Sequence, residues 1–127
     1  MLKKNWASGL ILILAGFTSV GLAQEFEDDF MQTVEDTHKS LSSNLAVHSG
    51  ESSLTDARLL EGYFAEIETH FVQRGDAPDG VSLSHKSQEL VSQILNSVAA
   101  NDFDTASKAS AELGRTCKEC HRLYKQD

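Results

Sequence analysis

Apolar residues recur at steps of three and four along most of the chain after residue 24, a pattern typical of helices with one buried face. The chain has a single proline, Pro78, and few strand-like runs, which favours the same class. We predict helices over about Glu25–Val47, Leu54–Gln73, about Ser84–Ala99 and Phe103–Lys125. Helices joined by short connections predict an all-α fold, an antiparallel up-down-up-down four-helix bundle.

One side of each predicted helix carries the apolar residues that we expect in the core. These are Phe26, Phe30, Met31, Val34, Leu41 and Leu45; then Leu60, Phe64, Ile67 and Phe71, with Leu59 and Tyr63 beside them; then Leu90, Val91, Ile94, Leu95 and Val98; and finally Phe103, Ala106, Ala109, Leu113, Cys117, Cys120 and Tyr124. Ser107 and Ser110 fall on the polar side of the last helix. The two cysteines therefore continue a core-facing stripe.

Turn-forming and capping residues separate these segments. Gly50 is predicted to end or follow the first helix, and Ser53 to cap the second, with Asp56 three residues later as in a capping box. Residues 75–80 are rich in turn formers and predict a loop. Asp102 is expected to cap the last helix.

The N-terminal segment reads as a targeting signal rather than part of the fold. Lys3 and Lys4 precede a mostly apolar run from Gly9 to Leu22, and small residues precede a cleavage site after Ala23. The run is short for a membrane span, which needs about 20 residues, so we favour cleavage over an uncleaved anchor. We predict a signal peptide over residues 1–23, a domain over 24–127, and export to the periplasm without stable membrane insertion.

The charge balance is acidic. The formal net charge is −8, and loss of Lys3 and Lys4 with the signal changes it to −10. Nucleic acid is an unsuitable partner, because phosphate binding needs a basic surface. A basic redox partner would be attracted by this charge, but we favour a solvated acidic surface as its explanation until a partner is shown. No catalytic triad, phosphate loop or paired-carboxylate site is recognisable, so we expect no enzyme.

The sequence Cys117-Lys118-Glu119-Cys120-His121 has the form C-x-x-C-H, the attachment signature of a c-type haem. Two thiols add to the porphyrin vinyl groups, and the following imidazole ligates the iron. On a helix these three side chains share a face. The alternatives are a disulfide, half of a zinc site or a redox pair. Zinc sites usually take four ligands, the chain has no other cysteine, and no strand precedes the motif.

Four predicted helices with this motif near the C-terminus resemble the class II c-type cytochromes, the cytochrome c-prime family. The run from Cys117 through His121 and Tyr124 to Lys125 is similar to the family's closing C-x-x-C-H-x-x-Y-R. Lys125 replaces the usual Arg and keeps only its charge, and the third helix lacks the Trp of many members. The resemblance implies one covalent haem c in the bundle core, with Cys117 and Cys120 as thioethers and His121 as the proximal iron ligand. Members often form homodimers through the first two helices.

The family divides by the ligand on the opposite side of the iron. Met31 falls at the family's distal position, and it is the single Met after residue 23. The run from Phe26 to Thr33 is also similar to the first helix of related cytochrome b bundles, which carry a Met ligand at a similar place. The resemblance therefore implies a low-spin member with Met31 as distal ligand. His38, two turns along the same face, is the rival ligand, and an open distal site is the third alternative.

These expectations lead to three functional hypotheses. The first is a periplasmic monohaem electron carrier that exchanges electrons with redox partner proteins. The alternative is a high-spin cytochrome c-prime that binds or senses small gases such as nitric oxide. The third is a helical module without haem, containing a disulfide between Cys117 and Cys120. The remaining histidines, His48, His70 and His85, are expected to be exposed polar residues.

Overall fold

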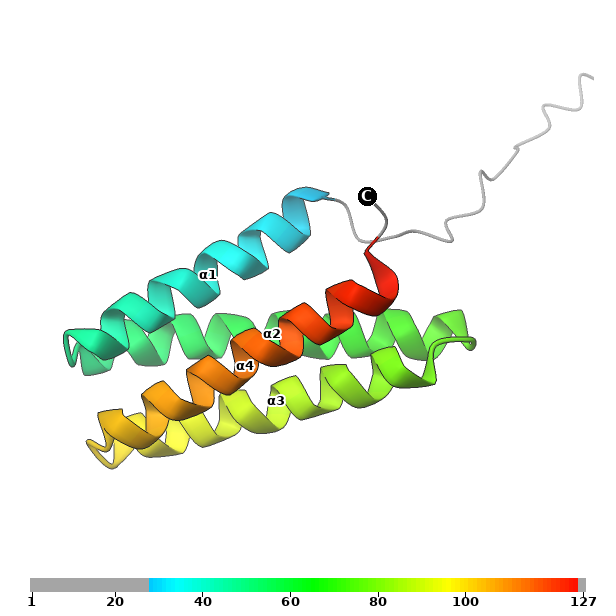
Figure 1. The fold of residues 1–127 in the computed structure, drawn as a ribbon. Coiled ribbons are helices and arrows are strands. Elements are labelled where there is room, and N and C mark those ends of the chain that lie inside the picture. Colours follow the sequence, from blue (N-terminus) through cyan, green and yellow to red (C-terminus); the bar gives the residue numbers. More distant parts are fainter. Residues whose placement is uncertain (1–27, 126–127) are drawn as a thin grey trace, which may run out of the picture.

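A computed structural model describes residues 28–125 and confirms the predicted all-α class. The predicted signal peptide, its cleavage site and Phe26 lie outside these residues. The described part contains no strand and is built from four helices (Figure 1): α1 Asp28–Ala46, α2 Gly50–Arg74, α3 Pro78–Ala99 and α4 Phe103–Tyr124. None of the four is long and apolar enough to cross a membrane.

The four helices pack side by side in alternating directions. Connections at 47–49, 75–77 and 100–102 hold only three residues each, so each helix runs back along the one before it. Successive helices are in contact, and α1 also meets α4, although that contact is the least extensive of the four. As Figure 1 shows, the start of α1 and the end of α4 lie at the same end of the bundle.

The apolar stripes meet along the axis of the bundle, as predicted. The largest apolar side chains with almost no exposure to solvent are Leu41, Leu45, Leu60, Ile94, Leu113 and Val91. Leu59, which was placed beside the stripe of the second helix, is 45% exposed instead. The core therefore follows the helical period that the sequence shows, with contributions from every helix.

The core is closed less completely at the end where α1 begins and α4 ends. In the first half of α1 only Val34 is buried, whereas Phe30 and Met31 are half-buried. Cys117 and Cys120 of α4 are also half-buried and pack against the same core. This half-closed end places apolar and sulfur-bearing side chains beside solvent.

The structure corrects the predicted start of the second helix. Gly50 follows α1, which is one of the two predicted alternatives, but it also opens α2, with Ser49 as an N-cap that makes no side-chain hydrogen bond. Ser53, predicted as the cap, lies in the first turn with its backbone N–H donating to the Ser49 carbonyl at 3.0 Å. Ser53 is fully buried, because it continues the core face one turn before Ala57.

The predicted loop over residues 75–80 is also too long. Helix α3 begins at Pro78, because a proline needs no backbone hydrogen bond in the first turn of a helix. Gly80 is buried in that turn against the ring of Phe71. The expected cap of the last helix is confirmed: the Asp102 carboxylate accepts a hydrogen bond from the Thr105 backbone N–H at 3.0 Å.

Candidate functional site

The C-x-x-C-H motif occupies the last turns of α4 and faces the half-closed end of the core. Cys117 and Cys120 are one helical turn apart, and both are free thiols. Both pack against the buried apolar cluster, and His121 beside them is half-buried. The structure therefore brings two thiols and an imidazole to one side of one helix, as the sequence predicted.

The two thiols lie in surroundings that keep them protonated. Burial, with smaller contributions from the neighbouring Cys120 and the Glu35 carboxylate, raises the pKa of Cys117 to about 11. Burial also raises the pKa of Cys120. A thiol is a nucleophile only as its thiolate, so neither side chain is activated for covalent catalysis at neutral pH.

Tyr124, three residues after His121, ties the end of α4 to the rest of the bundle. Its ring packs on Phe71 with the centroids 4.8 Å apart, and the Arg74 guanidinium lies 5.5 Å from its centroid. Its hydroxyl accepts a hydrogen bond from the Gly80 backbone N–H at 3.0 Å. These contacts hold the motif's helical turn against α2 and the start of α3.

Helix α1 presents its first half to the motif. Met31 is half-buried and packs against the core that the cysteines contact, and Phe30 meets the Tyr63 ring edge-on at 5.7 Å. Glu35, one turn after Met31, has its pKa lowered chiefly by its bond to Lys39. Positive charge on Lys125 and on protonated His121 lowers that pKa further, so this part of α1 lies near the end of α4.

His38 lies farther along α1 and already has a partner. Its Nε2 is 2.9 Å from the Ser110 carbonyl oxygen and 3.1 Å from the Ser110 Oγ. A carbonyl oxygen only accepts, so Nε2 must carry the proton and donate it. In this arrangement the Nε2 lone pair is not available to an iron.

The sequence reasoning missed this junction between α1 and α4. Ser110 was placed on the polar side of the last helix, yet it is 2% exposed, because it lies against His38 and Ser42. The sequence did contain a pattern that indicates this junction. Ala106, Ser110 and Gly114 are small residues spaced four apart, and this spacing lets a neighbouring helix come close. Ser107, by contrast, is exposed as expected.

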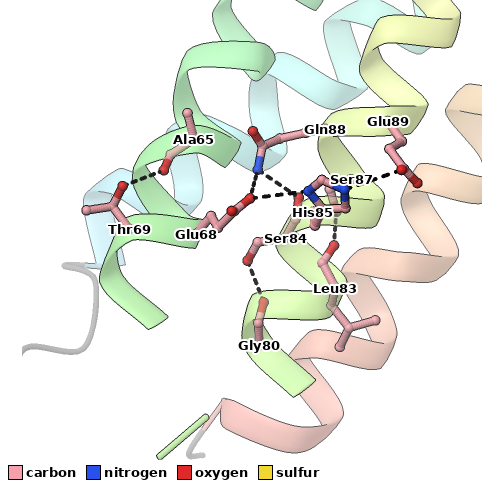
Figure 2. A network of polar contacts seen from close by, with 10 residues as sticks. All are labelled: Ala65, Glu68, Thr69, Gly80, Leu83, Ser84, His85, Ser87, Gln88 and Glu89. Atoms are coloured by element: carbon pink, nitrogen blue, oxygen red, sulfur yellow. Dashed lines mark hydrogen bonds and ion pairs between the residues drawn. The ribbon is translucent and has the colours of Figure 1, made fainter. Parts of the chain in front are cut away.

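The other histidines lie away from the motif. His85 is exposed on α3 and faces Glu68 and Glu89 at 3.8 and 3.3 Å, within the polar network between α2 and α3 that Figure 2 shows. His48 is exposed, as expected, and stacks on Phe103 at 4.7 Å. His70 is half-buried rather than exposed, and its ring meets Phe71 at 5.5 Å.

In the part of the chain that the structure describes, no preformed metal centre marks the motif. Within residues 28–125 no three His, Cys, Asp or Glu side chains gather closely enough to hold a metal ion. Two shallow hollows of about 510 and 470 Å³ lie elsewhere, one along α3 and one beside the connections at 47–49 and 100–102. Comparison of the chain with protein-family models, with curated proteins and with solved structures found no match.

Proposed function

We propose that this chain is a monohaem c-type cytochrome of the c-prime type, an exported carrier of single electrons with a covalent haem in the bundle core. The observation that carries the proposal is the side of α4 on which Cys117, Cys120 and His121 gather. Both thiols are free, they sit in apolar surroundings, and the core there is half-closed. Haem held by these residues would supply an iron that changes its charge by one electron.

Each residue of the site has a distinct part in this proposal. Cys117 and Cys120 hold the group through thioethers, and His121 ligates the iron on the proximal side. Met31, on the helix that faces the motif, is the proposed distal ligand, and a His/Met pair raises the reduction potential. The apolar side chains around the thiols limit access of water to the site.

The contacts around the motif suit an electron carrier whose structure changes little between its redox states. Tyr124 is held by a hydrogen bond and by contacts to two other helices, which restrains the turn that carries His121. No bond of a substrate is broken in this function, so the chain is not proposed as an enzyme. Its partners are other redox proteins, and the net charge of −10 after cleavage favours a basic partner surface.

The first experiment asks whether haem is attached. The protein is exported by a strain that matures c-type cytochromes, and the intact mass is measured under denaturing conditions. We expect a chain beginning at Gln24 with the added mass of one haem, and no attachment in the Cys117→Ala, Cys120→Ala double variant. A mass two hydrogens below that of the reduced chain, without haem, would instead support the disulfide hypothesis and refute the proposal.

The second experiment asks what lies on the distal side of the iron. We expect a six-coordinate low-spin spectrum with the weak near-infrared sulfur-to-iron band, and loss of that band in Met31→Ala. Met31→Leu serves as a control, because it removes the sulfur while keeping a side chain of similar size. Ferrous wild-type protein that binds carbon monoxide readily would overturn the carrier hypothesis in favour of the gas-binding alternative.

A further inference from the structure

Helices α1 and α4 are joined by a small polar junction two turns away from the motif. We define the α1–α4 junction as His38 and Ser42 of α1 with Ser110 and Gly114 of α4. His38 Nε2–H donates to the Ser110 carbonyl at 2.9 Å, and the Ser110 and Ser42 hydroxyl oxygens are 3.0 Å apart. Ser110 is buried and His38 is half-buried, so these bonds are partly shielded from water.

The junction depends on a glycine in α4. A Cβ atom at Gly114 would lie 3.3 Å from the His38 Cε1 atom, closer than ordinary van der Waals contact. The imidazole therefore rests against bare backbone, and this close approach lets Nε2 reach the Ser110 carbonyl. A Cβ atom at 114 would require the His38 ring to shift by a few tenths of an ångström, which strains its bond to the Ser110 carbonyl.

The junction fixes how far α1 is shifted along α4. Met31 lies seven residues before His38, and Cys117 lies seven residues after Ser110. In an antiparallel pair these two steps are equal in length and direction, about 10 Å at 1.5 Å per residue. When His38 meets Ser110, Met31 is therefore carried to the level of Cys117 and the turn that follows it.

Apolar packing alone holds this pair weakly. The α1–α4 contact is the least extensive in the bundle, and the first half of α1 buries only Val34. Apolar surfaces resist sliding less than directional hydrogen bonds, which are lost when the donor and the acceptor move out of line. The junction is thus the part of this interface that sets its register.

We infer that His38 is a positioning residue and not an iron ligand: the α1–α4 junction sets the register that holds Met31 opposite Cys117 and His121. This inference rests on the proposed function, because it assigns the junction a task at the proposed haem site. The inference also gives different roles to Met31 and His38, which the sequence had left as alternative distal ligands. Met31 supplies the distal atom, and His38 determines where that atom lies.

The test uses the haem-loaded protein and compares His38→Leu, His38→Gln and His85→Leu. Leu removes the donor, whereas the Gln amide can still donate to the Ser110 carbonyl. His85 is a matched histidine, exposed on α3 and away from the junction. The readouts are the near-infrared Met–iron band, the fraction of ferrous protein that binds carbon monoxide, and hydrogen exchange of the amides of residues 30–36.

We expect His38→Leu to weaken the band and to raise the carbon monoxide-binding population about fivefold, the factor that corresponds to loss of one hydrogen bond. Exchange of the α1 amides should accelerate in the same variant. His38→Gln should restore most of the wild-type behaviour, and His85→Leu should match the wild type. Gly114→Ala is a second variant that favours folding of α4, and it should shift the band and the exchange in the same direction.

The outcomes separate this inference from the proposed function. If the wild type shows the Met–iron band and both His38→Leu and Gly114→Ala leave it unchanged, the inference alone is overturned. Loss of the band in His38→Gln as complete as in Met31→Ala would show that donation to the Ser110 carbonyl is not what holds Met31 in place, and it would also overturn the inference. A wild-type protein with attached haem but without the band would overturn the Met31 assignment and this inference together.

Discussion

Replacement of Gly80 by Ala tests whether close packing around Tyr124 holds the motif end of the bundle together. A Cβ atom at this position would lie 2.6 Å from the Phe71 Cγ and Cδ1 atoms. Neither atom can move freely, because the Phe71 ring is 6% exposed and packs on Tyr124 at 4.8 Å. Gly80 also donates its backbone N–H to the Tyr124 hydroxyl, so a shift of either ring disturbs that bond.

Two opposing effects determine how far Gly80→Ala changes the free energy of unfolding. Gly→Ala within a helix ordinarily stabilises by about 1 kcal/mol. Overpacking a buried site costs about 1–3 kcal/mol. We expect Gly80→Ala to lower the free energy of unfolding by about 1–2 kcal/mol, since the clash involves ring atoms near the Cβ of Phe71 rather than the end of a flexible chain. The melting temperature should fall by roughly 4–8 °C per kcal/mol.

The assay is urea unfolding followed by helical circular dichroism, with two comparisons. Gly62→Ala is the matched control, because no atom lies within 4 Å of its added Cβ, and it should stabilise by about 1 kcal/mol. In a Phe71→Leu background, the smaller and more flexible side chain should make Gly80→Ala neutral or stabilising. If Gly80→Ala stabilised the wild-type protein as much as Gly62→Ala does, the packing argument would be refuted.

Three further predictions address single side chains. The buried Ser53 hydroxyl has no hydrogen-bond partner, so Ser53→Ala should leave the free energy of unfolding unchanged or raise it by about 1 kcal/mol in urea unfolding. Hydrogen bonds from Thr105 hold the pKa of Asp102 below its usual 3.8. The contribution of Asp102 to stability is therefore present above pH 3.8 and is lost as the pH falls through the lower pKa of the folded state. Acid unfolding of Asp102→Ala should lack this pH-dependent loss of stability. Burial raises the pKa of Cys117 from 9.0 to about 11, so the haem-free chain should lose about 3 kcal/mol of stability as the pH rises across that interval. In urea unfolding at pH 8 and 11, Cys117→Ala should show a smaller loss, because the raised pKa of Cys120 still contributes, and attachment of haem to both thiols should abolish it.

The helices were predictable because their signal is local. Leu60, Phe64, Ile67 and Phe71 repeat at the helical period, and each of them is buried as that period requires. The cap at Asp102 was predictable for the same reason, since its bond reaches only to Thr105. The side of α4 that carries both cysteines followed from their spacing and the stripe before them.

The helix starts were less predictable, because glycine and proline have more than one local meaning. Gly50 and Pro78 were read as markers of a turn, yet each lies in the first turn of a helix. Gly80 was read as a loop residue, although its place in α3 is explained by the Phe71 ring that covers it. That ring belongs to another helix, so no local pattern around residue 80 contains the information.

The candidate site likewise has one part that the sequence predicted and one part that it did not. The sequence by itself determined that the chain forms amphipathic helices and that Cys117, Cys120 and His121 lie on one side of the last one, because both properties depend on residue order within one helix. The iron ligands stay predictions. Only the tertiary structure decided that Ser110 is buried and that His38 bonds to it. The physical reason is that the register between two helices depends on contacts between residues 72 positions apart in the chain, which the pattern within either helix does not specify.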